Sequence, residues 1–162
     1  MSAAARSRLA TQQAAVVSAL VSDGAIPVGF DAEHLHVATE SLLRKRCRSV
    51  ARAWPTLARH LGLEFPEQFA AYAETTPQPR HGGPLADGRG FANWTRQRGW
   101  LSEAVRLQTL AVDVRFVRSR DGLHPRRWAT IKFAWLTQPR RLVIALRWPR
   151  IGERWFTVRL GW

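Results

Sequence analysis

A basic run is the first place in this sequence where residue types and spacing point to binding chemistry. Residues 42–55 read Leu-Leu-Arg-Lys-Arg-Cys-Arg-Ser-Val-Ala-Arg-Ala-Trp-Pro. At about 100° per residue, four basic side chains fall on one side of a helix and the apolar side chains on the other. These four are Arg44, Lys45, Arg48 and Arg52. They indicate either a solvated face or a surface for an acidic partner, and we take them as a candidate partner interface.

One further arginine of this run falls in the middle of the apolar side. Arg46 would be buried there, and a buried charge without a partner is energetically expensive. We therefore predict that Arg46 forms an internal ion pair, with Glu74 or Asp87 as the partner. An exposed and unpaired Arg46 would mean that the helical register is wrong.

The last third of the chain holds most of the excess charge. Residues 111–162 carry a net charge of +9 of the total of +13, and the basic residues are nearly all arginine. Arginine favours bidentate contacts with carboxylate or phosphate, so we expect a polyanionic partner. Our candidate peptide-binding residues are Lys132, Arg147, Trp155 and Arg159. Arginine and tryptophan on one sheet face suit an acidic peptide added as a strand, and they also suit single-stranded nucleic acid. A subunit interface and a merely solvated face stay open.

No set of residues in the sequence forms a recognisable catalytic site. Five histidines are present, two of them on one predicted helix but pointing to different sides, and three scattered singly: His34, His36, His60, His81 and His124. Cys47 is the only cysteine, and no general base accompanies it. The glycine-containing segment 87–90 lacks the preceding strand that a phosphate-binding loop needs. We expect a non-catalytic protein with no metal site and no cofactor.

The single cysteine and the absence of targeting features indicate the cellular setting. One cysteine excludes an internal disulfide, and the first residues lack the apolar stretch of a signal peptide. No stretch approaches the roughly 18 apolar residues of a membrane span. These features predict a cytoplasmic protein that does not contact a membrane.

Helical periodicity dominates the first two thirds of the chain. Apolar spacing, Asp31 as an N-cap and the Trp54-Pro55 stop predict the helix that carries the basic run. The predicted helices span residues 2–22, 32–53, 56–61, one that starts at 66, 85–98 and 101–112. The three prolines and two glycines of residues 75–84 predict a loop.

Near Asp113 the spacing of apolar residues changes to every second residue, which predicts antiparallel strands. The alternating segments are 112–117, 130–135, 142–147 and 155–162, and they are separated by turn residues. We expect the set that contains Ile131, Phe133 and Trp135 to face the core, and the basic set to face solvent. The fold class is therefore α+β, with a helical domain over residues 1–110 and a small antiparallel β-meander over residues 111–162.

Five short motifs, in this order and spacing, resemble a known family. They are residues 42–55, 57–62, 64–65, 69–72 and the loop 82–88. Together they are similar to the actinobacterial branch of a family that carries the label of a DNA-binding domain, over about residues 6–110. Its members resemble the partner subunits of multinuclear non-haem iron oxidative enzymes, such as the second subunit of the methanobactin-forming pair. That family commonly has Tyr-Arg-Asn-Asn at residues 43–46, and only Arg44 matches, so no role of the asparagines carries over.

The resemblance implies a non-catalytic subunit of a heterodimer. Such a subunit would bind the leader of a ribosomally made precursor peptide and present it to the iron enzyme, whose own residues hold the iron. The older label implies a regulator that binds DNA or RNA, which rests on analogy of fold. The strength and salt dependence of nucleic-acid binding distinguish the two.

Overall fold

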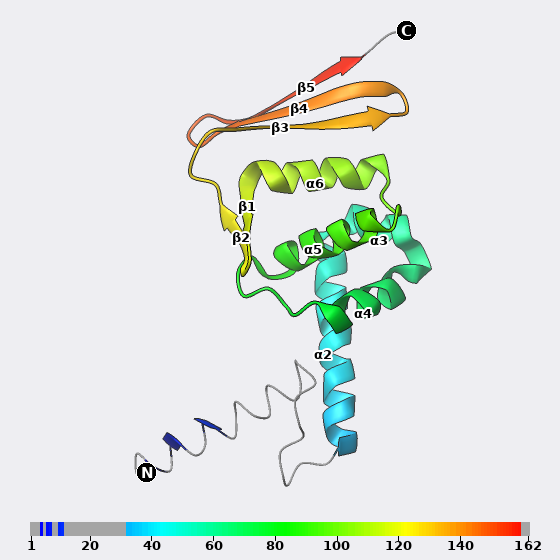
Figure 1. The fold of residues 1–162 in the computed structure, drawn as a ribbon, viewed down its shortest axis with the longest axis vertical. Helices are drawn as coiled ribbons and strands as arrows, with labels where there is room; N and C mark the ends of the chain where they lie inside the picture. Colours follow the sequence, from blue (N-terminus) through cyan, green and yellow to red (C-terminus); the bar gives the residue numbers. More distant parts are fainter. Residues whose placement is uncertain (1–3, 5, 8–9, 12–31, 160–162) are drawn as a thin grey trace.

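The computed structural model describes residues 4, 6–7, 10–11 and 32–159. The predicted helix over residues 2–22 lies almost wholly outside this part. Within it, the elements form three layers: a sheet at one end, a single helix beneath it, and a group of helices at the other side (Figure 1). The α+β class is therefore confirmed, with helices followed by antiparallel sheets.

The helices begin and end close to the predicted residues. They are α2 (Ala32–Ala53), α3 (Pro55–Leu61), the short 3₁₀ helix η1 (Gly62–Glu64), α4 (Phe65–Thr75), α5 (Gly83–Gln97) and α6 (Glu103–Arg115). α2 has the predicted bounds, because Pro55 occupies the first turn of α3 and forces a break after Ala53. The hydroxyl of Ser102 accepts a hydrogen bond from the amide of Val105 and caps α6, as predicted.

Aromatic side chains fill the core between α2, α3, α4 and α5. Trp54, Leu57, Phe69 and Phe91 are fully buried. The Phe69 and Phe91 rings meet edge to face, with centroids 5.3 Å apart, a favourable geometry for an aromatic pair. The indole nitrogen of Trp54 donates to the carbonyl of Leu85, so its polar atom is satisfied inside the core.

The glycines of segment 87–90 bring other side chains close to α5. A Cβ on Gly88 would lie 2.1 Å from Cδ1 of Trp54, and a Cβ on Gly90 would lie 2.4 Å from the hydroxyl of Tyr72. The intervening Arg89 donates two hydrogen bonds of 2.7 Å to Asp113 on α6. The segment is therefore part of the packing between helices, in agreement with the conclusion that it is not a phosphate loop.

α6 lies between two hydrophobic cores. Val105 and Val112 contribute to the core of the helical layer, while Leu110 and Val114 contribute to a second core beneath the sheet. The prediction that a strand begins near residue 112 is wrong, because α6 continues to Arg115. Residues two apart on a helix point about 200° apart, so alternating valines suit a helix that is buried on both sides. The predicted boundary after residue 110 falls inside this helix.

The strands form two antiparallel sheets. A hairpin of β1 (Phe116–Ser119) and β2 (Gly122–Pro125) turns at Arg120-Asp121, one residue before the predicted Asp121-Gly122, and the sequence did not single out β2 as a strand. The larger sheet has the order β3-β4-β5, with β3 (Thr130–Thr137), β4 (Arg140–Trp148) and β5 (Gly152–Arg159). This sheet is the predicted meander.

The prediction of which sheet face is buried is wrong. Ile131 and Phe133 are 61% and 71% exposed, whereas Leu136 and Ala145 on the opposite face are fully buried against α6. The buried face carries small side chains such as Ala134 and Ala145, which let the helix approach the sheet closely. The bulkier apolar face is turned away from the chain.

Candidate functional site

The outer face of the larger sheet is a continuous apolar surface. We call "outer face" the side chains that cross-strand pairing places together in three rows: Ile131, Leu146 and Arg154; Phe133, Ile144 and Phe156; Trp135, Leu142 and Val158. Ile131, Phe133, Trp135, Phe156 and Val158 are each between 46% and 71% exposed. Exposed apolar surfaces of this kind mark interaction sites on proteins that are otherwise well packed.

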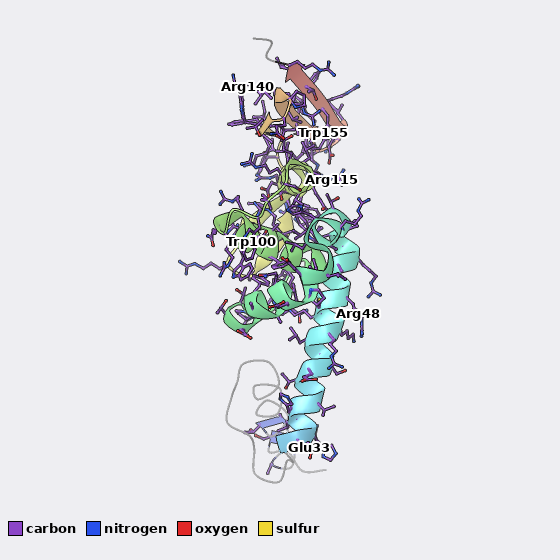
Figure 2. The ribbon with its side chains drawn as sticks, turned by 90° about the vertical axis from the view of Figure 1, so that its right-hand side faces the viewer. Glu33, Arg48, Trp100, Arg115, Arg140 and Trp155 are labelled. Atoms are coloured by element: carbon purple, nitrogen blue, oxygen red, sulfur yellow. The ribbon has the colours of Figure 1, made fainter. Side chains whose placement is uncertain are left out.

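Arginines border this apolar surface. Arg154 lies in its first row, and Arg140 lies at the β3–β4 turn (Figure 2). Both side chains are exposed. A partner that covers the outer face would therefore match it best with an apolar centre and carboxylates at the border.

The four predicted peptide-binding residues share one face, but it is the face that α6 covers in part. The pairing register puts Lys132 beside Ala145 and Trp155, and puts Arg147 and Arg159 on the same side. Arg147 is already engaged, because its guanidinium donates to the carbonyls of Arg126 (3.1 Å) and Arg115 (3.4 Å). The expectation of a fully open basic face is thus wrong. Trp155 and Arg159 on β5 remain exposed, and their role stays a prediction.

A carboxylate anchors the start of β5 to the helix below. Glu153 accepts hydrogen bonds of 2.7 and 2.9 Å from Arg115 and lies 3.9 Å from Arg147. The hydrogen bonds between the two side chains lower the pKa of Glu153 and raise the pKa of Arg115. Two of the basic groups near the sheet therefore share one internal negative charge.

The four basic residues predicted as a partner interface are all exposed on α2. Arg44 pairs with Glu40 at 2.7 Å, and Arg52 lies 3.5 Å from the hydroxyl of Ser49. Figure 2 shows Arg48 far along the molecule from Trp155, on a different layer. The structure thus separates the α2 surface from the sheet, and its contact with a partner stays a prediction.

The predicted internal partner of Arg46 is confirmed as Asp87. The guanidinium donates two hydrogen bonds, of 2.7 and 2.8 Å, to the two carboxylate oxygens of Asp87, and a third of 3.0 Å to the carbonyl of Thr76. It also lies over the ring of Phe69, 5.5 Å from its centroid. The Tyr72 hydroxyl donates to the same carboxylate at 3.3 Å, and burial, followed by the charge of Asp87, raises the pKa of Tyr72. The pair is a structural element.

The only cysteine offers no activated nucleophile. Cys47 is partly buried against the core of the helical layer, as predicted for a boundary thiol. Burial raises its pKa, and the charge of Arg48 opposes this only in part. The thiol is therefore mostly protonated at neutral pH and reacts poorly.

Two histidines that are scattered in the sequence meet around an aspartate. Nδ1 of His81 lies 3.0 Å from one oxygen of Asp121, and Nε2 of His124 lies 3.1 Å from the other. The two imidazole rings have their centroids 5.0 Å apart. Sequence reasoning missed this group because residue 81 and the β1–β2 turn are about 40 residues apart. The only signal was a histidine three residues after the Asp-Gly turn.

The comparison with known families concerns the first part of the chain. Residues 10–97 match the family described as "SCO6045-like, C-terminal domain". The chain belongs to this family. The match includes α2 to α5 and ends before α6.

One relative has a similar segment within a much longer protein. A "UPF0276 protein" of Streptomyces avermitilis is 41% identical over 88 residues, which cover 54% of this chain and 18% of that protein. The matched part of this chain thus corresponds to less than a fifth of the relative. No solved structure matches the chain. None of the described helices is long and apolar enough to span a membrane.

Proposed function

We propose that this protein is a non-catalytic partner that binds a ribosomally made precursor peptide and presents it to a multinuclear non-haem iron oxidative enzyme. One observation carries the proposal: the sheet has an uncovered apolar face and an open edge strand, both close to arginines. The longer relative supports a role as a non-catalytic partner, because in that protein a similar segment makes up only a minor part of the chain. The resemblance of the sequence motifs to partner subunits is the reason why this class of enzyme is proposed.

The open edge belongs to β5, because side chains of α6 occupy groups on the other edge strand. Arg106 donates to the carbonyl of Trp135 at 3.3 Å, and the amides of Thr137 and Gln138 donate to Glu103. Among the residues that the structure describes, β5 pairs with β4 alone and no comparable side chain reaches its other edge. A free edge presents unpaired amides and carbonyls that bind an extended peptide as a further strand.

The two sides of β5 indicate the peptide sequence that fits. An added strand alternates its side chains between the two faces. On the outer face these side chains would meet Phe156 and Val158, and on the other face they would meet Trp155 and Arg159. We therefore expect a segment in which apolar residues alternate with acidic ones.

The basic surface of α2 is the second part of the proposal. Because it lies away from the sheet, the chain can hold a peptide on β5 while Lys45 and Arg48 contact an acidic surface of the enzyme. Charge attraction of this kind speeds and orients the docking of two proteins.

The edge of β5 can be tested with a single proline. Because the carbonyl of Trp135 accepts from Arg106 on α6, we infer that it faces away from β4 and, by antiparallel alternation, that the amide of Thr157 faces the free edge. We expect Thr157→Pro to remove one hydrogen bond to an added strand and to keep the sheet, since proline is tolerated at such positions. Thr157→Ala is the matched control. Fluorescence anisotropy with a labelled precursor leader should give about tenfold weaker binding for the proline variant, equivalent to one hydrogen bond. Equal binding of all three proteins would refute binding at this edge.

The enzyme partner is tested by co-purification with a multinuclear non-haem iron enzyme from the same organism, with and without the peptide. We expect a complex that weakens when Lys45 and Arg48 are both changed to Glu, while the change of Thr157 on β5 to Ala has no effect. Absence of a complex in all conditions would overturn the assignment of the partner.

Nucleic acid remains the second candidate because of the charge and the exposed aromatic rings. Trp128 and Trp148 are 83% and 47% exposed in the same basic region. Exposed rings and arginines can stack on bases and contact phosphates. This alternative predicts binding to single-stranded DNA or RNA that falls steeply with salt. Absent binding at low salt would remove it.

A further inference from the structure

We propose that His81, Asp121 and His124 form a binding site for a divalent transition-metal ion such as zinc. This inference is independent of the proposed function, because the three residues lie on the hairpin of β1 and β2 and on the segment before α5. They offer two imidazole nitrogens and one carboxylate oxygen, and these three atoms lie within 4.8 Å of one another.

The distances fit a tetrahedral ion with little rearrangement. Zinc binds nitrogen and oxygen ligands at about 2.0–2.1 Å, which places tetrahedral ligand atoms about 3.3 Å apart. The two nitrogens lie 3.0 and 3.1 Å from the carboxylate oxygens. An ion between the three groups requires a small widening of these contacts and an approach of the two rings. Their side chains are 40–57% exposed, so an ion can enter from solvent.

The backbone holds the two segments in a fixed relation. The amide of His81 donates to the carbonyl of Asp121 at 2.9 Å, and the amide of Leu123 donates to the carbonyl of His81 at 3.1 Å. Gly122 allows this contact, because a Cβ there would lie 1.9 Å from the carbonyl oxygen of His81. Its φ of +142° is also rarely adopted by other residues. Residues from two distant segments thus converge before any ion binds.

The donor set selects the kind of ion. Imidazole suits zinc, copper, nickel and iron, whereas calcium and magnesium prefer oxygen ligands alone. The hydroxyl of Ser119 donates to Asp121, and this is the main cause that lowers the pKa of Asp121, so its carboxylate is ionised and ready to bind a cation. Three protein ligands leave a fourth position for water or for a group of another molecule.

Nearby positive charge limits the affinity. Arg80, Arg118 and Arg120 adjoin the cluster in sequence, and all three are exposed. They disfavour a cation, so we expect binding in the micromolar range.

The test is a titration of the tag-free full chain with zinc chloride by isothermal calorimetry, repeated with cobalt(II), whose absorption reports the coordination geometry. We expect one ion per chain, with at least about 100-fold weaker binding after His81→Ala or His124→Ala. His36→Ala is the control, because His36 is also an exposed histidine beside a carboxylate, that of Glu40, but lies on α2 far from this cluster in the sequence. It should bind like the unchanged chain.

Asp121→Asn gives a second arm that keeps the backbone contact with His81. It should weaken zinc binding while the far-ultraviolet circular dichroism spectrum stays unchanged. No binding by the unchanged chain, or equal affinity in the His124→Ala variant, would overturn the site. If the unchanged chain does not bind zinc, the three residues act only as a hydrogen-bonded group.

Discussion

Arg46 and Arg44 both lie on α2, so their ion pairs allow the effect of burial on stability to be tested. Arg46 is 14% exposed and Asp87 is 1% exposed, whereas the pair of Arg44 and Glu40 is 71% and 48% exposed. Both pairs have a closest contact of 2.7 Å. The change of each arginine to methionine therefore compares a buried pair with two hydrogen bonds to an exposed pair with one.

The expected loss of stability for Arg46→Met follows from the hydrogen bonds that remain after the substitution. Asp87 would keep only the hydrogen bond from Tyr72, and the carbonyl of Thr76 would lose its donor. Removal of one partner of a buried ion pair costs about 3–5 kcal/mol, because the other charge stays buried and unpaired. For a chain of this size the loss corresponds to a fall in melting temperature of roughly 6–20 °C. Arg44→Met should cost at most about 1 kcal/mol.

The assay is urea denaturation monitored by tryptophan fluorescence. The free energies of unfolding are compared between variants that have the same dependence on urea concentration. The double variant Arg46→Met with Asp87→Asn should be less destabilised than the sum of the two single variants, by about 0.5–3 kcal/mol. Strict additivity, or equal losses for Arg46→Met and Arg44→Met, would refute the reasoning that burial determines the strength of this pair.

Three further predictions concern the sheet and the cysteine. Leu136→Ala should lower the free energy of unfolding by about 2–5 kcal/mol, whereas Phe133→Ala on the outer face should change it by less than about 1 kcal/mol, as measured by urea denaturation; equal losses would contradict the orientation of the sheet. The pKa of Glu153 is lowered in the folded chain, so its stabilising contribution is present above the ordinary value of 4.5 and is lost as the pH falls through the lowered value; the stability difference from Glu153→Gln should shrink in that range, and a pH-independent difference would contradict it. Cys47 should react with a thiol reagent at pH 8 more slowly than cysteine in a short peptide. Unfolding of the chain in roughly 8 M urea should remove this difference in rate. Equal rates in the folded state would count against burial of the thiol.

The sequence predicts local structure well where one residue determines the result. The end of α2 follows from the Trp54-Pro55 break, and the partner of Arg46 follows from the rule that buried charges are paired. Both arguments need only the neighbours along the chain or a single physical requirement.

Features that depend on what packs against an element were not predictable. The apolar alternation in β3 identifies two faces correctly, but the selection of the buried face depends on α6, which approaches the smaller side chains Ala134 and Ala145. The continuation of α6 through Val112 and Val114 has the same cause, because two cores cover opposite sides of one helix. The meeting of His81 and His124 depends on a backbone contact between distant segments.

The position of α6 between the two cores also determines where the chain can be shortened. The family match ends at residue 97, before α6 begins at Glu103. A fragment that stops there would leave the aromatic core without Val105 and Val112, and one that stops after Arg115 would expose Leu110 and Val114. Both fragments would therefore expose part of a hydrophobic core to solvent. The smallest fragment that we expect to fold by itself therefore extends through the sheet, well beyond the segment that defines the family.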